Sequence, residues 1–95
     1  MENLKRIENR IWKYRTAKGL KQTELAFLIG QKNPAQISRY ERGSVIPKLE
    51  QLIKLCFGLG TEIKDLYPGL IAKWQVEVET EKEKLNKFKL YAQAK

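Results

Sequence analysis

Two short helical patterns separated by a polar turn occupy residues 20–43 and constrain the fold more than any other part of the sequence. The first runs over residues 22–29, and Gly30 supplies a stop because glycine tolerates the left-handed conformation in which helices often end. The second runs over residues 34–42. It follows Asn33, whose side chain can cap free backbone N–H groups, and it opens on Pro34, which is tolerated in a first helical turn. Two short helices joined by a turn are therefore expected.

The second pattern has an apolar edge and a polar outer face. Ile37 and Tyr40, three residues apart, place apolar side chains on one side of the helix. The other side carries hydrogen-bonding and cationic side chains, and a short helix of this kind suits the major groove of DNA. The residues expected on that outer face are Ala35, Gln36, Ser38, Arg39 and Arg42.

In the order and spacing of its residues, the chain resembles the lambda repressor and Cro-like (XRE-type) helix-turn-helix superfamily over residues 11–66. The resemblance implies an all-α fold, a five-helix lambda repressor-like DNA-binding domain in residues 1–69, and regulation of transcription. One residue more than the commonest family spacing lies between Gly30 and Ile37, which predicts a longer turn at residues 31–33. The matching positions are Arg15, Gly19, Leu20, Gln22, Leu25, Ala26, Gly30, Ile37, Ser38, Arg39, Glu41, Arg42, Gly43, Pro47, Leu49, Leu52, Leu59 and Gly60.

Three further helices are expected around the motif. Apolar residues at helical spacing predict one over residues 3–18 and another over residues 49–59. A short helix is expected over residues 62–67, with Thr61 as its N-cap and Pro68 and Gly69 ending it. Cys56 is expected to be a small core residue. The buried side of the 49–59 helix is predicted to consist of Leu49, Leu52, Leu55, Cys56 and Leu59.

Residues 70–95 lie beyond the resemblance and predict an additional C-terminal amphipathic helix. Apolar side chains recur there at the a and d positions of a heptad, with Glu81 interrupting the series. A short strand over residues 74–78 remains an alternative, because apolar residues also alternate there. The apolar stripe can fold back on Ile53 and Phe57 or pair with a second chain. Its members are Ile71, Trp74, Val78, Leu85, Phe88 and Ala92.

Charge and composition agree with a DNA-binding protein and exclude several other classes. The net charge is +8; residues 1–66 hold 13 basic and 7 acidic side chains (+6), and residues 67–95 hold 6 and 4 (+2). A basic half that meets phosphates would release counterions. On charge alone, a soluble basic protein with a solvated surface is an equal alternative. The chain has one cysteine and no histidine, so no internal disulfide, metal site, cofactor or catalytic residue is expected. Without a secretory signal or a membrane span, a cytoplasmic location is expected.

The outer face of the second motif helix supplies the candidate base contacts. Arg39 can bond guanine O6 and N7, Gln36 can bond adenine N6 and N7, and Ala35 can touch a thymine methyl group. Asn33 is a fourth candidate, because Pro34 cannot read a base by hydrogen bonding. By resemblance, Gln22 bonds a backbone phosphate, and Arg15 and Glu41 form a structural ion pair. The candidate phosphate contacts are Lys21, Gln22, Lys32, Arg42, Ser44 and Lys48.

The resulting hypothesis is a sequence-specific transcriptional regulator, most simply a repressor, that binds double-stranded DNA as a homodimer. An antitoxin that binds a toxin protein and its own operator uses the same fold and is the main alternative. A protein-interaction module without DNA binding is another alternative. An enzyme is not expected, because no nucleophile and base can be combined without histidine.

Overall fold

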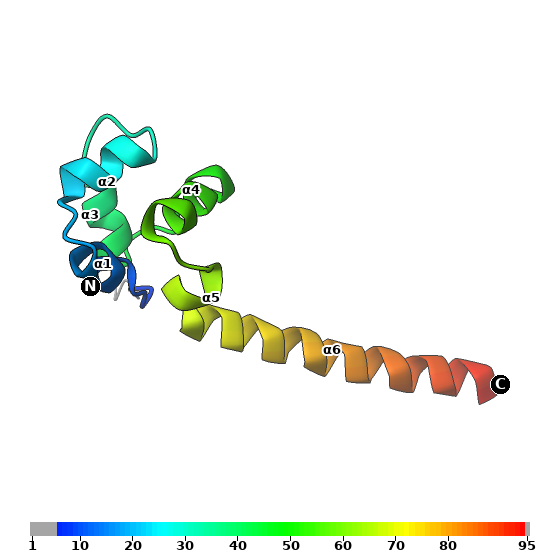
Figure 1. The fold of residues 1–95 in the computed structure, drawn as a ribbon. Coiled ribbons are helices and arrows are strands. Elements are labelled where there is room, and N and C mark those ends of the chain that lie inside the picture. Colours follow the sequence, from blue (N-terminus) through cyan, green and yellow to red (C-terminus); the bar gives the residue numbers. More distant parts are fainter. Residues whose placement is uncertain (1–5, 95) are drawn as a thin grey trace, which may run out of the picture.

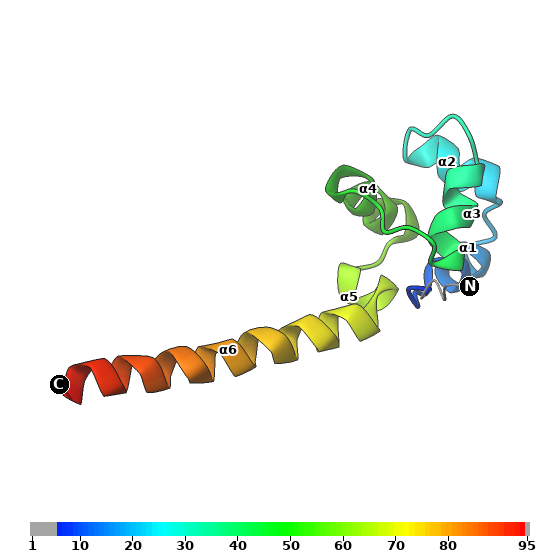
Figure 2. The same cartoon turned by 180° about the vertical axis from the view of Figure 1, so that it is seen from behind.

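The computed structural model describes residues 6–94, and this range contains six helices and no strand (Figure 1). Five short helices form a globular part, and a long sixth helix projects away from it, as the view from behind also shows (Figure 2). The predicted all-α fold with a C-terminal helix is confirmed, and the strand alternative over residues 74–78 is wrong. The helices are α1 (Ile11–Ala17), α2 (Gln22–Leu28), α3 (Ala35–Arg42), α4 (Leu49–Leu59), α5 (Ile63–Leu66) and α6 (Pro68–Ala94).

A single apolar core joins α1 to α5. Each of these helices contributes at least one side chain that is almost completely removed from water. Burial of a large aliphatic side chain stabilises a fold by about 1.5–3 kcal/mol, so this cluster holds the five short helices together. The core consists of Ile11, Leu25, Ala26, Ile29, Ile37, Tyr40, Leu55, Leu59, Leu66 and Tyr67.

Helix α1 begins at Ile11, so the prediction of a helix from residue 3 is wrong for residues 6–10. Backbone groups there bond to distant parts of the chain, because the N–H of Ile7 donates to the carbonyl of Gly43 at 2.9 Å. Asn9 accepts the N–H of Ile11 at 3.1 Å and donates to the carbonyl of Tyr40 at 2.9 Å. Ile7 thus packs on the core from a non-helical segment. Residues 3–5 of that predicted helix lie outside the described residues.

Gly43 allows this non-helical segment to cross the end of α3. It caps α3 with a left-handed φ of 77°, which glycine adopts without steric cost. A Cβ atom added to it would lie 2.3 Å from the carbonyl oxygen of Ile7. Any other residue would therefore displace the N-terminal segment from the end of α3.

The predicted bounds of α4 are confirmed, but its buried side is shorter than expected. Leu55 and Leu59 are buried, Leu52 and Cys56 are half-buried, and Leu49 is 73% exposed. Leu49 is the first residue of the helix and lies beyond the edge of the core. Burial raises the pKa of the Cys56 thiol, which agrees with a packing role for this side chain.

The junction between α5 and α6 differs from the prediction. Thr61 is not the N-cap of α5: the helix begins at Ile63, and its N-cap is Glu62, whose N–H donates to the Asp65 carboxylate at 2.8 Å. Pro68 opens α6 instead of ending α5, because proline lacks only an N–H that the first helical turn leaves unpaired in any case.

Helix α6 does not fold back on the globular part in this structure. Ile53 and Phe57 on α4, on which the C-terminal stripe could fold back, remain 48% and 85% exposed. Among the described residues of α6 none is buried, although Leu70 in its first turn packs against the core. Within residues 6–94, no helix is long and apolar enough to cross a membrane.

Candidate nucleic-acid interface

Helices α2 and α3 form a helix-turn-helix whose inner side is fixed by the core. Ile37 and Tyr40 anchor α3, as their spacing predicted, while Leu25 and Ala26 anchor α2. Gly30 ends α2 with a φ of 77°. A turn lies between Leu28 and Ala35, where the longer turn was predicted. With its apolar residues buried, α3 exposes Ala35, Arg39 and Arg42 on its outer side.

Side-chain contacts hold the turn in place on both sides. The backbone N–H of Gln31 donates to the carbonyl of Ala26 at 2.8 Å, and its side-chain amide donates to Gln51 on α4 at 3.0 Å. At the far end of the turn, Asn33 Oδ1 accepts the N–H of Ala35 at 2.8 Å. Asn33 thus holds the start of α3, but α3 begins at Ala35 and its N-cap is Pro34, so the prediction that the helix opens on Pro34 is wrong by one residue.

The four candidate base contacts occupy one end and the outer face of α3. Asn33, Ala35 and Arg39 are exposed, and Gln36 is half-buried. Arg39 Nη1 donates to Gln36 Oε1 at 2.9 Å, so two of these side chains are bonded to each other in the free protein. The structure therefore places the candidate base contacts within one helix and its preceding turn.

The candidate phosphate contacts fall into two groups: exposed lysines, and side chains that are hydrogen-bonded within the protein. Lys21, Lys32 and Lys48 are exposed. Arg42 donates to the Ser38 hydroxyl, and the Ser44 hydroxyl donates to the carbonyl of Arg39 at 3.2 Å. Arg42 and Ser44 thus make contacts within the protein that stiffen the C-terminal end of α3.

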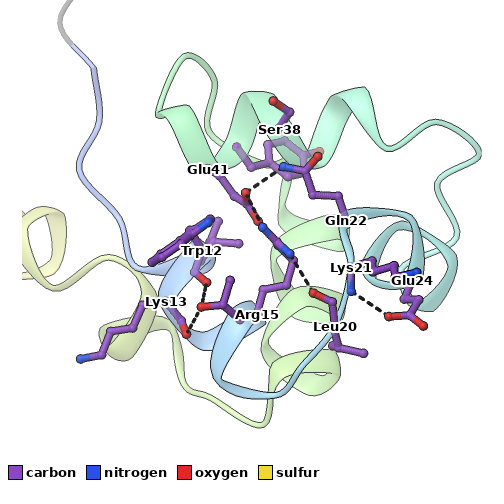
Figure 3. Close-up of polar contacts among 12 residues, drawn as sticks. Trp12, Lys13, Arg15, Leu20, Lys21, Gln22, Glu24, Ser38 and Glu41 are labelled. Carbon is purple, nitrogen blue, oxygen red and sulfur yellow. Dashed lines mark hydrogen bonds and ion pairs between the residues drawn. The ribbon is translucent and has the colours of Figure 1, made fainter.

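A buried polar network ties α1, α2 and α3 together (Figure 3). The Arg15 guanidinium donates through two nitrogens to the two carboxylate oxygens of Glu41, and its third nitrogen donates to the carbonyl of Leu20 at 2.7 Å. The side chains of Arg15 and Glu41 are only 10% and 7% exposed. The structural ion pair expected from the resemblance has this geometry, and it fixes the C-terminal part of α3 relative to α1.

Gln22 joins this network, which the sequence did not predict. Its amide nitrogen donates to Glu41 Oε1 at 2.9 Å. The amide group has two N–H donors, so one remains for a further acceptor when the other is bonded to Glu41. The resemblance indicated only a phosphate contact for Gln22, and nothing in the helical spacing relates it to a carboxylate 19 residues away.

Arg6 is a second feature that the sequence did not indicate. Its guanidinium donates to the carbonyl of Arg42 at 3.3 Å, next to the end of α3. Helical periodicity predicted a helix through this residue, whereas a non-helical segment brings its cationic side chain to the motif. Arg6 therefore adds positive charge beside Arg42, where two guanidinium groups favour an anionic partner.

Comparisons with known proteins agree with this geometry. Residues 13–66, which include α2 and α3, match the helix-turn-helix family. The chain is similar to a solved structure, the restriction-modification controller protein C.AhdI from Aeromonas hydrophila, with 38% identity and a TM-score of 0.54. That alignment covers 59% of this chain and 83% of the controller protein. None of the curated proteins matches the chain.

Proposed function

The chain belongs to the lambda repressor and Cro-like, XRE-type helix-turn-helix family, and from this premise we propose that it is a transcriptional repressor that reads specific DNA sequences with α3. One observation carries the proposal: α3 is fixed to the core through Ile37 and Tyr40 while its polar and cationic side faces outward. A repressor needs no chemistry, because occupation of the DNA site excludes other proteins from it. The similarity to a controller protein supports a regulator.

Base recognition in this proposal comes from the outer face of α3. Arg39 binds guanine through O6 and N7, and Gln36 binds adenine through N6 and N7, after their mutual hydrogen bond opens. Ala35 contacts a thymine methyl group. Asn33 contributes from the turn through its amide nitrogen, while its oxygen keeps the cap on Ala35.

Phosphate contacts position the helix in the groove. Lys21, Lys32, Arg42, Ser44 and Lys48 meet the backbone as charges or hydrogen-bond donors. Gln22 donates its second amide N–H to a phosphate at the N-terminal end of α2, where backbone N–H groups also favour an anion. These contacts are independent of sequence, so they set the affinity for all DNA.

We further propose that two copies of the chain bind one site. A single helix-turn-helix covers a half-site, and two-fold proteins place two of them about one helical turn apart on a palindrome. The apolar stripe of α6, which is exposed from Trp74 onward, provides a surface for assembly outside the DNA-binding helices.

The test is a salt titration on a site selected from random DNA. With roughly five phosphate contacts per protomer, the logarithm of the binding constant should fall against the logarithm of salt concentration with a slope of about −4 to −5 per protomer. A binding constant that does not change with salt would contradict the proposal.

Two lysine variants give this titration a matched control. Lys48→Ala removes a proposed phosphate contact beside α4 and should reduce the slope by about one. Lys87→Ala removes the same charge from the exposed part of α6 and should leave the slope unchanged. Equal effects of the two substitutions would show that the slope reports net charge rather than contacts at the motif.

A further inference from the structure

Six apolar side chains of α6 lie at heptad spacing and form a seam, here called the α6 seam, while Val76, Leu90 and Tyr91 lie outside it. The exposed fractions of Trp74, Val78, Leu85 and Phe88 lie between 47% and 66%. Glu81 occupies the d position between Val78 and Leu85. A seam of this kind, although Glu81 interrupts it, favours a second helix at its surface. The α6 seam consists of Ile71, Trp74, Val78, Leu85, Phe88 and Ala92.

Resting on the proposed function, we propose that the α6 seam binds the α6 seam of a second copy of this chain in antiparallel orientation. Val78 of each copy packs beside Glu81 of the other, and the two-fold axis passes between residues 79 and 80. The a positions of one helix then face the d positions of the other. The remaining facing pairs are Ile71 with Phe88 and Trp74 with Leu85.

A parallel pair places like charges together. Every layer of a parallel pair joins a residue to its own copy, so the two Glu81 carboxylates would meet inside the seam. Lys84 at the g position would also lie beside Lys89 at the following e position of the second helix, and this repulsion would occur twice. The attractive contact of Glu77 with Lys82 of the second copy also occurs twice in that orientation. It offsets the two lysine contacts, and the meeting of the two Glu81 carboxylates remains uncompensated.

The antiparallel pair matches charges at the same flanking positions. Here g positions face g positions, so Glu77 lies beside Lys84 of the second copy, and the pair occurs twice. Lys82 lies beside Gln75, which is neutral. Lys84 also lies 3.2 Å from Glu81 on its own helix, so each lysine offsets one carboxylate in the seam and one at its edge.

The charges also select one register among the antiparallel ones. If the contact between the two helices moves by one heptad toward their N-termini, Glu77 lies opposite Glu77 of the second copy. A shift toward the C-terminus brings Lys84 opposite Lys84 and Lys82 opposite Lys82. The register with Val78 beside Glu81 avoids all three like-charge contacts.

This register also suits a two-fold DNA site. Residue 68 of one copy lies opposite residue 91 of the other, so the two starts of α6 are about 35 Å apart along the helix at about 1.5 Å per residue. Half-sites on DNA repeat at about 34–36 Å. The antiparallel pair thus separates the two starts of α6 by a distance similar to one turn of the duplex.

Disulfide cross-linking of the full chain distinguishes the orientations. In a Cys56→Ala background, Trp74→Cys and Leu85→Cys are made in separate chains. The antiparallel pair predicts a cross-linked product when the two variants are mixed, and little product from either alone. Self-cross-linking of the Leu85→Cys variant at least as efficient as the mixed reaction would indicate a parallel pair and overturn the proposal.

A charge reversal gives a second, sign-dependent test. Lys84→Glu should weaken the dimer roughly tenfold in sedimentation equilibrium, because two attractive pairs become repulsive. Glu77→Lys in the same chain should restore the affinity by exchanging the charges. In a parallel pair Lys84→Glu would strengthen the dimer, since it would face Lys89. Lys87→Glu, on the outer side of α6, is the matched control and should change the affinity little.

The same proteins separate this inference from the proposed function. The reduced Cys variants, which keep α2 and α3 intact, are assayed for binding to a half-site duplex. If the unmodified chain does not bind DNA, the proposed function is contradicted. DNA binding that persists in a chain that stays monomeric, or that cross-links only to itself, would overturn the α6 pair alone.

Discussion

The globular part and α6 use apolar side chains in opposite ways. In α1 to α5, residues such as Ile37 and Leu55 are completely buried against their own chain. In α6, Leu85 and Phe88 also lie at helical spacing, but their side chains remain 51% and 66% exposed. Amphipathic spacing therefore predicts a helix in both regions. Whether the apolar face of that helix is covered within one chain depends on how many other helices lie around it.

The largest expected effect concerns the buried network of the globular part. Arg15→Ala leaves the Glu41 carboxylate, only 7% exposed, without its cationic partner, so the free energy of unfolding should fall by about 3–5 kcal/mol in urea denaturation. Glu79→Ala in α6 breaks an exposed ion pair with Lys82 and should change the free energy of unfolding by less than about 0.5 kcal/mol. Similar losses in both variants would remove the contrast between the regions.

A leucine in each region tests the contrast with the same substitution. Leu55→Ala creates a cavity in the core and should cost about 2–5 kcal/mol of unfolding free energy. Leu85→Ala, measured at a protein concentration low enough to keep the chain monomeric, should cost less than about 0.5 kcal/mol. If Leu85→Ala destabilises the monomer as much as Leu55→Ala, the α6 seam is covered by its own chain.

DNA recognition should be confined to the globular part. Arg39→Ala should reduce discrimination between the best site and its single-base variants by about 1–3 kcal/mol, because one bidentate contact is lost. Gln22→Ala should weaken all sites nearly equally. Competition binding measures both quantities. An Arg39→Ala protein as selective and as tight as the wild type would show that Arg39 reads no base.

The smallest effect at neutral pH concerns Tyr67, between α5 and α6. Burial raises the pKa of its hydroxyl to about 12, and within residues 6–94 this hydroxyl has no hydrogen-bond partner. Above pH about 10 the unfolded chain releases the proton first, so the contribution of Tyr67 to stability is complete below pH about 10 and falls as the pH rises to about 12.

Tyr67→Phe removes this pH dependence without removing the ring. At pH 7 the variant should be as stable as the wild type or slightly more stable, because no hydrogen bond is lost. Its advantage should grow between pH 10 and 12 in parallel denaturation series. A constant difference across that range would show that the hydroxyl does not change its protonation on unfolding.

The sequence predicted the motif better than its surroundings, for identifiable reasons. Gly30, Ile37 and Tyr40 act locally, through a helix stop and helical spacing, so their roles were readable without the fold. Ile7 also lies at helical spacing from Ile11, but its backbone bonds to Gly43, 36 residues away. Periodicity cannot distinguish a helical residue from one that reaches the core on a non-helical segment.

The candidate site shows the same division. The exposure of Arg39 and Ala35 follows from their position relative to the buried edge of α3. The bond from Gln22 to Glu41 depends on how α2 and α3 cross, and the contact of Arg6 with Arg42 depends on the path of the N-terminal segment. Both contacts depend on how separate elements lie relative to each other, so neither contact could be predicted from spacing within one element.

The hydrogen bond between Arg39 and Gln36 has a consequence for how operators encode information. Two side chains that hold each other in the free protein cannot choose their bases independently, since each must leave the other to bind. Base preferences at the two corresponding positions should therefore be correlated. A description that scores each position of the operator separately would misjudge sites in which both bases change together.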